Sequence, residues 1–383
     1  MQDYSPECLE VLRLLKIRKN VLMMGAPACG KTSLMSEVAH AFKNGFVTTG
    51  APLNPTLVDD SAIPFPSAVP VATGTTPFAQ MPSPDRTNRD IFTTVFSANS
   101  KPRDFLSGLF PVVGSGGAGL GFRVVHGELV RANKHAFQAG GASLLLIDEL
   151  NRGPAVQLFG DSIVAIEADK RYAEDDSGPT KKSYPFKVME QATGDMKPEY
   201  LSSHLYILAA MNQADVSVEP LDVAFIRRWE RFVLTPSAEK VREKLVASGP
   251  TLALPAIPAS PSEVVEAAVR AWEVVNQRIS LGRGAEFQLG HGVFFSRATA
   301  PLASVSDALS MAVSCWTTIV AHLDEVFMGD SFSVAATLAT NATSSFYKLE
   351  SGTFGQEQRQ VFRALKPIDP TNVYELLLAV GRG

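Results

Sequence analysis

Gly25-Ala26-Pro27-Ala28-Cys29-Gly30-Lys31-Thr32 is the stretch of this 383-residue sequence that decides its fold, because it fits the pattern G-x-x-x-x-G-K-[ST]. An apolar run precedes it at residues 21–24, and a helical pattern follows it to about Phe42. Glycines between a strand and a helix let backbone N–H groups face an anion, and the positive end of the helix points to the same place. The stretch therefore predicts a phosphate loop.

We expect this loop and the residue after it to hold a nucleotide. Lys31 can reach the β- and γ-phosphates, and the Thr32 hydroxyl can bind Mg²⁺. The predicted nucleotide-binding residues are Gly25, Ala26, Pro27, Ala28, Cys29, Gly30, Lys31, Thr32 and Ser33.

A second decisive stretch is the apolar run at residues 144–147, which ends in Asp148 and Glu149. This is a Walker B pattern, typical of a central strand that delivers two carboxylates to the nucleotide. Asp148 can orient Mg²⁺ through its water shell, and Glu149 can polarise a water for attack on the γ-phosphate. The two motifs together predict nucleotide hydrolysis.

Polar residues follow two later elements. The buried strand predicted at 205–210 delivers Asn212 to its carboxyl end, where the amide can help to hold the attacking water. The short helix predicted at 221–229 ends in Arg227 and Arg228, which either face solvent or reach the γ-phosphate of a neighbouring subunit in a ring.

The composition is that of an ordinary globular protein, with 45% hydrophobic and 19% charged residues. The formal net charge of -4 gives no whole-chain reason to expect nucleic-acid binding. No apolar run reaches the roughly 18 residues that a membrane span needs, so we expect a cytoplasmic protein without membrane contact. Three cysteines, Cys8, Cys29 and Cys315, make neither a disulfide framework nor a zinc site. At a helix N-terminus, Cys29 is either a passive loop residue or a reactive thiol.

Two segments interrupt the pattern of strands and helices. Residues 51–90 carry eight prolines and few charges, which predicts an irregular insertion. Residues 114–121 carry five glycines, which predicts a mobile loop.

The remaining pattern gives an order of elements. The expected elements are helices at 5–18, 128–138 and about 156–166, a buried strand at 91–96, a hairpin within 172–188 and a last strand at 232–234. Past Pro236 we expect only helices, among them one that begins at a capping box, Ser260 to Glu263, and one from about 304 to 328 with a stripe from Leu309 to Phe327. The predicted fold is an α/β P-loop domain at 1–235, with a central parallel sheet flanked by helices, followed by an α-helical lid domain at 236–383.

These motifs, in this order, resemble those of the AAA+ NTPases, and several details resemble the McrB family of restriction-system motors. The similar segments are 104–111, Asp148 to Gly153, 159–160, 169–171, 211–215, 225–232, 288–291 and 323–330. The resemblance covers about residues 18–335.

The resemblance implies a nucleotide-driven hexameric ring that works with an McrC-like nuclease subunit. It implies that Asn212 and Asp215 form a sensor loop, that Arg227 or Arg228 acts on the neighbour's nucleotide, and that His291 lies near the nucleotide at the lid. Only about twenty residues precede the phosphate loop, so we expect DNA to be recognised through a partner chain. Gln213 and Val216 depart from the residues usual in the family's sensor stretch.

Two other functions fit the same motifs: a MoxR-like chaperone ATPase that remodels protein complexes, and a scaffold gated by nucleotide binding alone. The base also stays open between ATP and GTP. No carboxylate lies near the base at 15–20 or 288–291, and Glu286 is the nearest. The absence of an obvious acceptor for guanine favours ATP.

Overall fold

The structure is a computed structural model that describes residues 4–44, 81–113, 120–214, 221–246, 253–298, 300–338 and 344–382. Most of the proline-rich segment, most of the glycine-rich stretch and Asp215 lie outside the described residues. The chain divides into two compact units. The first contains Met1–Met23, Thr32–Met211 and Ser217–Phe232, and the second contains Met24–Lys31, Asn212–Val216 and Val233–Gly383.

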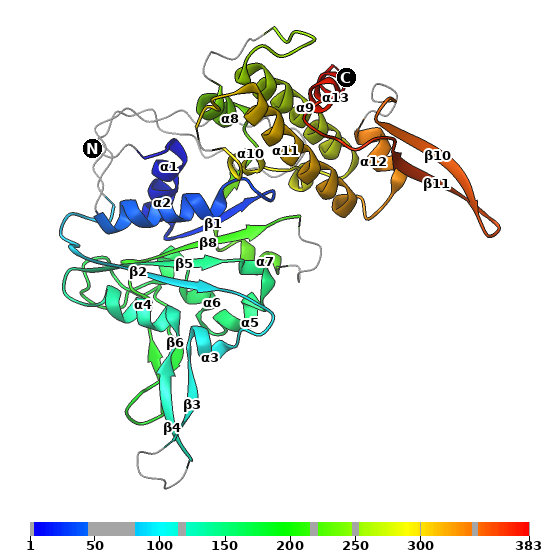
Figure 1. Cartoon of the computed structure of the whole chain (residues 1–383). Coiled ribbons are helices and arrows are strands. Elements are labelled where there is room, and N and C mark those ends of the chain that lie inside the picture. The colour runs from blue at the N-terminus through cyan, green and yellow to red at the C-terminus, as the bar shows by residue number, and fades with distance from the viewer. Residues whose placement is uncertain are drawn as a thin grey trace. The chain divides into compact units, whose positions relative to one another are not determined.

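A five-stranded sheet carries the P-loop topology (Figure 1), with its strands in the order β2-β5-β8-β1-β9. Their bounds are Asn20–Gly25 for β1, Asn88–Val95 for β2, Gly141–Asp148 for β5, Leu205–Asn212 for β8 and Glu230–Leu234 for β9. β2 pairs with β5, and β5 with β8, in parallel. β8 therefore lies between the strand that leads to the phosphate loop and the strand that ends in Asp148.

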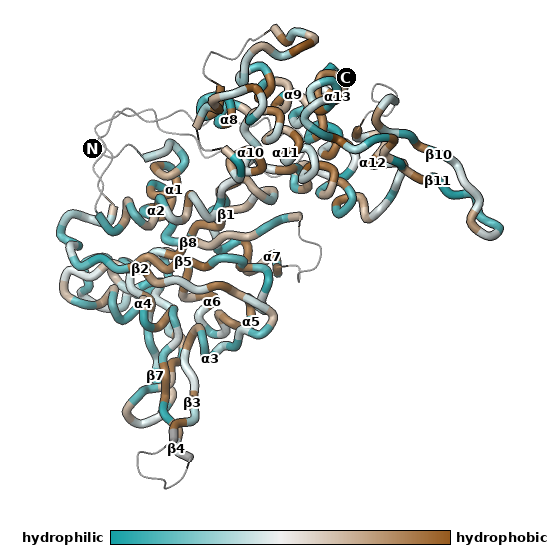
Figure 2. The backbone as a smooth tube through the Cα atoms, in the orientation of Figure 1, coloured by the Kyte–Doolittle hydropathy of each residue, from teal (hydrophilic) through white to brown (hydrophobic). Residues whose placement is uncertain are grey.

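Burial along the strands follows this order. β1, β5 and β8 are buried along almost their whole length, as their continuous apolar runs predict, and Figure 2 shows brown, hydrophobic colour along the central strands. β2 was expected to be buried, which is wrong. It forms the edge of the sheet, and Val95 is 64% exposed. An apolar run alone cannot distinguish an edge strand from a central one.

Two helices precede and follow the phosphate loop as predicted. α1 spans Pro6–Arg18 and is capped by the Ser5 hydroxyl, which accepts from the Cys8 N–H. α2 spans Lys31–Asn44 and buries Leu34, Val38 and Phe42. The further helical segments of the first unit are α3 at Pro102–Phe105, α4 at Glu128–Ala136, η1 at Leu150–Arg152, η2 at Ala168–Lys170 and α7 at Val223–Ile226.

The helix expected at about 156–166 is wrong in one respect, because the chain forms two short helices there. α5 spans Ala155–Phe159 and α6 spans Ser162–Ala165. Gly160 between them has a φ of 47°, a left-handed conformation that ends α5.

Two hairpins belong to the first unit. β3 (Ser107–Val113) pairs with β4 (Leu120–His126), and β6 (Phe186–Met189) pairs with β7 (Met196–Glu199). The hairpin expected within 172–188 is therefore misplaced, since β6 begins only at Phe186 and pairs with β7, and the earlier residues carry an isolated bridge between Tyr172 and Pro179.

The second unit is mainly helical. Its helices are α8 at Ala238–Leu245, α9 at Pro261–Gly282, η3 at Ala285–Phe287, α10 at Gly292–Phe295, α11 at Val305–Val326, α12 at Ser331–Thr337 and α13 at Val373–Gly381. The predicted capping box is present, because Ser260 accepts from the Glu263 N–H and Glu263 accepts from the Ser260 N–H. Trp272 of α9 and Trp316 of α11 are each 1% exposed and lie in one core.

Two expectations for this unit need correction. It is not wholly helical, because β10 (Tyr347–Phe354) and β11 (Glu357–Ala364) form an antiparallel hairpin. The Trp316 indole N–H donates to the Tyr347 hydroxyl over 2.7 Å and so joins α11 to β10. The apolar stripe of α11 is also shifted: Leu309 and Phe327 are only partly buried, and the buried face is centred on Ala312, Cys315 and Ile319. None of the helices in the described ranges is both long and apolar enough to span a membrane.

Candidate nucleotide site

The phosphate loop joins β1 to α2, and its backbone requires small residues. Ala28 and Gly30 have φ values of 60° and 86°, so the loop turns through left-handed conformations at both positions. Gly25 faces the last strand so closely that an added Cβ would lie 2.4 Å from Leu234 O. The backbone of this loop has the tight turns that a phosphate cradle requires.

Lys31 lies at the first turn of α2, and its ammonium group is wrapped by the loop. Nζ donates to Gly25 O over 2.9 Å and to Ala26 O over 3.0 Å. The side chains of Thr32 and Ser33, next along the helix, are exposed. The loop thus presents one ammonium group and two hydroxyl groups at a helix N-terminus, which suits a polyphosphate.

A loop at 288–292 lies against the phosphate loop within the second unit. The Gly290 N–H donates to Pro27 O, and the Gly292 N–H donates to Ala28 O, both over 2.8 Å. A Cβ on Gly290 would lie 2.1 Å from the carbonyl carbon of Ala28. Only glycine allows this approach between the two backbones. We call residues 288–292 the clasp loop.

His291 lies in the middle of the clasp loop and is 5% exposed. Its Nδ1 accepts a hydrogen bond from the Ser237 N–H over 3.2 Å. A neutral imidazole that accepts at Nδ1 carries its proton on Nε2. That nitrogen is on the side of Gly30, since a Cβ on Gly30 would lie 3.8 Å from it. His291 therefore presents an N–H donor beside the phosphate loop.

Cys29 is a buried thiol, 2% exposed. Burial raises the pKa of this thiol to about 11, against the smaller opposing effect of the nearby Lys31 charge. The structure therefore favours the alternative in which Cys29 is a passive loop residue, because burial keeps the thiol protonated.

The Walker B strand delivers its two carboxylates within the first unit. Asp148 is the last residue of β5, and its Oδ1 accepts from the Glu149 N–H over 2.9 Å. Glu149 follows in a left-handed conformation, with φ 53° and ψ 47°, which is rare for a residue with a side chain. Arg152 Nε donates to Glu149 Oε2 over 3.0 Å, so the carboxylate has a fixed neighbour. Such a strained position is typical of a site where function constrains the backbone.

Asn212 ends β8 and is half-buried. β8 pairs with β5 in parallel, with Ala209 opposite Ile147. The structure thus places Asn212 at the carboxyl end of the strand next to the Walker B strand, as the sequence predicts.

The two arginines that follow α7 differ in their contacts. Arg228 Nε lies 2.8 Å from a Glu167 carboxylate oxygen, and the Arg228 guanidinium also donates to Ala224 O. Arg227 is exposed, and among the residues that the structure describes its guanidinium makes no hydrogen bond or ion pair. Phe225 and Trp229 on either side pack against Phe159 and fix the helix.

A buried cation that the sequence analysis missed lies near α7. Arg171 is 1% exposed and donates to three backbone carbonyls, of Ile166, Ser202 and Leu205, and to the Asn20 side chain. Asn20, also fully buried, donates back to Ile166 O and to Arg228 O. Desolvation lowers the pKa of Arg171 to about 9, which leaves it charged at neutral pH. The sequence signal was Asn20, a polar residue at the start of the otherwise apolar strand β1.

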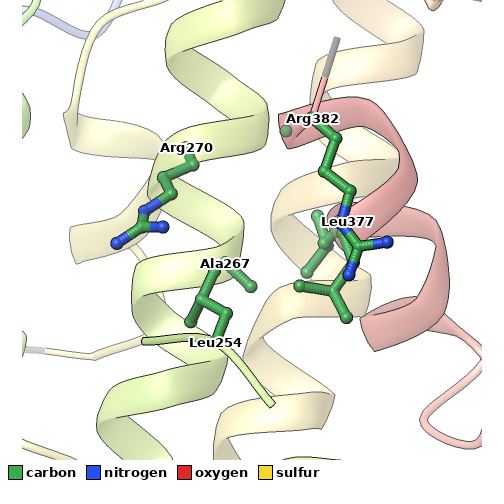
Figure 3. Close-up of a pocket in the computed structure, with 7 residues that line it drawn as sticks. Leu254, Ala267, Arg270, Leu377 and Arg382 are labelled. Atoms are coloured by element: carbon green, nitrogen blue, oxygen red, sulfur yellow. The ribbon is translucent and has the colours of Figure 1, made fainter. Parts of the chain in front are cut away.

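One small cavity lies in the second unit, between α9 and α13 (Figure 3). It has a volume of about 170 Å³, and Arg270 and Arg382 flank an apolar floor that includes Leu377. None of its lining residues is among the predicted nucleotide-binding residues.

Residues 78–229 match the family model of the AAA domain (dynein-related subfamily). The match includes the Walker B residues and both arginines that follow α7, whereas the phosphate loop precedes it. The chain is 26% identical over 292 residues to the type IV methyl-directed restriction enzyme EcoKMcrB subunit of Escherichia coli (strain K12), which covers 74% of this chain and 49% of that protein.

A second relative is the type II restriction enzyme BsuMI component YdiS of Bacillus subtilis (strain 168), 28% identical over 227 residues, or 56% of this chain and 57% of that protein. The chain thus spans about half the length of the curated relatives it matches. The solved structure of C. elegans PCH-2 is 11% identical and covers 82% of this chain and 67% of that chain, but its TM-score of 0.30 is too low to carry an argument. With the sheet order of a P-loop domain and a match to the AAA domain over residues 78–229, the chain has the AAA+ fold and is similar to the McrB type of restriction subunit.

Proposed function

We propose that this chain hydrolyses a nucleoside triphosphate at the phosphate loop, with Mg²⁺, as the motor of a restriction or antiphage system. The observation that carries the proposal is the loop at residues 25–32, whose left-handed turns and Lys31 ammonium form an anion cradle at the N-terminus of α2. AAA domains are, as a class, nucleotide-hydrolysing domains. The proposal assigns this chemistry to named residues.

The donor set suits Mg²⁺. The exposed Thr32 hydroxyl and the half-buried Asp148 carboxylate are hard oxygen donors, which this ion prefers. Among the described residues no group of three or more His, Cys, Asp or Glu side chains could hold a metal ion. A site with two protein oxygens is the kind in which Mg²⁺ keeps waters and binds substrate phosphates. When bound, the ion would neutralise charge on the β- and γ-phosphates.

The protein residues then have separate tasks. Lys31 and the loop N–H groups bind the phosphates, and Glu149 orients the attacking water and accepts its proton. Asn212 holds the same water from the neighbouring strand, with Asp215 as a further sensor residue outside the described part of the chain. His291 donates from Nε2 to a phosphate oxygen.

We further propose a hexameric ring in which Arg227 acts on the nucleotide of the adjacent subunit. Its exposure, next to an Arg228 that is already paired with Glu167, supports this choice between the two arginines. An arginine supplied in trans stabilises the transition-state charge, and this makes turnover depend on assembly.

The partner in this proposal is an McrC-like nuclease subunit, with DNA reached through a partner chain. The two relatives, both components of restriction enzymes, support this class over a MoxR-like chaperone. We propose ATP as the nucleotide, because the segments at 15–20 and 288–291 offer no carboxylate for the N1–H and amine of guanine.

The test is turnover by the purified chain, alone and with a nuclease encoded beside it, with ATP and with GTP. The proposal predicts Mg²⁺-dependent phosphate release that Glu149→Gln abolishes and that the nuclease subunit changes. Binding without turnover in any assembly would instead favour a nucleotide-gated scaffold. A tenfold or greater preference for GTP in competition binding to the Glu149→Gln protein would overturn the choice of ATP.

A further inference from the structure

We propose that Asn276, on α9 and remote from any phosphate, is a positioning residue that sets the nucleotide affinity of the phosphate loop through the clasp loop. The inference rests on the proposed nucleotide binding. Asn276 belongs to none of the sequence motifs described above.

The side chain of Asn276 bonds to both backbone groups of Leu289, a residue of the clasp loop. Its Nδ2 donates to Leu289 O over 2.9 Å, and its Oδ1 accepts from the Leu289 N–H over 2.8 Å. Trp272, one turn earlier on α9, adds a second donor to Leu289 O, also over 2.9 Å. Asn276 is 4% exposed and Leu289 is 6% exposed, so water is poorly placed to replace these bonds.

The residues that follow Leu289 transmit this position to the phosphate loop. Gly290 and Gly292 bond to the carbonyls of Pro27 and Ala28, and the Gly290 backbone lies in contact with the Ala28 backbone. No side chain separates the two segments, so a displacement of the clasp loop moves or releases the phosphate loop. The same two bonds restrain the phosphate loop beside its left-handed residues, Ala28 and Gly30.

The clasp loop also carries His291, with its Nε2 on the side of Gly30. Loss of the Leu289 anchor therefore affects two parts of the phosphate site together, the loop backbone and the imidazole donor. We expect Asn276→Ala to weaken nucleotide binding about tenfold, the size of effect typical when one buried hydrogen-bond anchor is lost.

A matched control exists in the first unit. Asn133 of α4 is fully buried and makes a similar pair of bonds, to two residues in place of one: its Nδ2 donates to Tyr200 O over 2.9 Å, and its Oδ1 accepts from the Ser202 N–H over 2.8 Å. Asn133→Ala removes an equivalent anchor from a segment that does not contact the phosphate loop in this way. This variant therefore loses a comparable buried hydrogen-bond anchor, but we expect its nucleotide affinity to stay unchanged.

The experiment compares both variants with the unaltered chain, by amide hydrogen exchange without nucleotide and by calorimetric titration with a non-hydrolysable ATP analogue and its GTP counterpart. Asn276→Ala should speed exchange at 288–293, where the Gly290 and Gly292 amides are the donors, and raise Kd about tenfold. Asn133→Ala should speed exchange at 200–205 and leave Kd within twofold. Equal Kd values for the two variants, whether both are weakened or neither, would overturn the proposal.

Trp272→Phe serves as a second variant where Asn276→Ala does not fold. It removes one of the two donors to Leu289 O, so we expect exchange at 288–293 and Kd each to rise two- to threefold; no change in either would overturn the proposal. The exchange measurement needs no ligand. If exchange responds as expected while the unaltered chain binds neither analogue, the proposed function is wrong, but the role of Asn276 in positioning the clasp loop is supported.

Discussion

Arg228 and Glu167 form an ion pair in the first unit, with 2.8 Å between the guanidinium Nε and the carboxylate oxygen. The side chains are 11% and 31% exposed, so the pair is partly withdrawn from water. This pairing gives the two adjacent arginines different roles. Arg228 holds the end of α7 to the segment after α6, whereas Arg227 is exposed, as its proposed action on an adjacent subunit requires.

We therefore predict that Arg227→Ala lowers the hydrolysis rate about 10³-fold without loss of stability, since arginine fingers contribute effects of that size. Arg228→Ala should instead lower the free energy of unfolding by about 1–3 kcal/mol, because it leaves the Glu167 carboxylate without its partner. Steady-state turnover measures the first effect, and chemical denaturation measures the second.

Mixed subunits test whether Arg227 acts in trans. Arg227→Ala subunits mixed with Lys31→Ala subunits should recover part of the activity. Rings that form but stay inactive would contradict action in trans.

A second prediction separates binding from chemistry. Lys31→Ala should abolish tight nucleotide binding, because its ammonium is the one charge inside the loop that can neutralise phosphate. Glu149→Gln should keep the affinity and stop hydrolysis, because an amide cannot accept the water's proton. Equal loss of affinity in both variants, measured by titration, would show that Glu149 is misassigned.

A third prediction concerns Arg171 as a structural cation. Arg171→Leu leaves the Asn20 amide and the carbonyl of Leu205 without their donor, so we expect a loss of at least about 3 kcal/mol in unfolding free energy. Arg171→Lys should rescue only part, because one ammonium cannot serve all four acceptors. Lys170→Ala, at the next position, should cost less than about 0.5 kcal/mol. A similar loss for Lys170→Ala would contradict a specific role for Arg171.

A fourth prediction is that the three thiols are inert in the folded protein. Burial raises the pKa of Cys29 to about 11 and that of Cys8 and Cys315 to about 12. At pH 8 the thiolate fraction of Cys29 is then about 10⁻³. Iodoacetamide should label none of the three at pH 8, and all three in urea.

The same pKa shifts have a consequence for stability. The thiols ionise more readily in the unfolded chain, where their pKa is near the ordinary value of 9.0. Their contribution to the free energy of unfolding is therefore complete below pH 9 and is lost as the pH rises towards 11 or 12. Rapid labelling of Cys29 in the folded protein at pH 8 would contradict the burial that raises its pKa.

The central elements could be predicted from sequence because their patterns have a single structural interpretation. The apolar run of β5 could be assigned to a central strand because it ends in Asp148 and Glu149 and follows a phosphate loop, and the Ser260 capping box is typical of a helix start. Other features depended on tertiary context. Gly160 could have been tolerated within a helix, but its left-handed turn divides α5 from α6. The β10–β11 hairpin is exposed on both faces along most of its length, so its sequence has no alternation of apolar and polar residues that would predict two strands.

The candidate site follows the same division. Motifs predicted the residues that face phosphate, because their chemistry requires a fixed spacing. They did not predict Asn276, which is a polar residue one turn after Trp272 on the apolar face of α9. Its partners are the backbone N–H and C=O of Leu289, and a bond to backbone groups requires no particular side chain at the partner position. The restraint by Glu167 that distinguishes Arg228 from Arg227 likewise joins residues far apart in the chain.

The bonds from Gly290 and Gly292 to the phosphate loop also constrain how the protein folds. Their acceptors, Pro27 and Ala28, lie far from them in the sequence, so the contact closes a long loop of chain. A fragment that stops at Thr235 carries the complete phosphate-loop motif without the residues that bond to it. We therefore expect the phosphate loop to reach its native conformation only once residues 288–292 have folded against it.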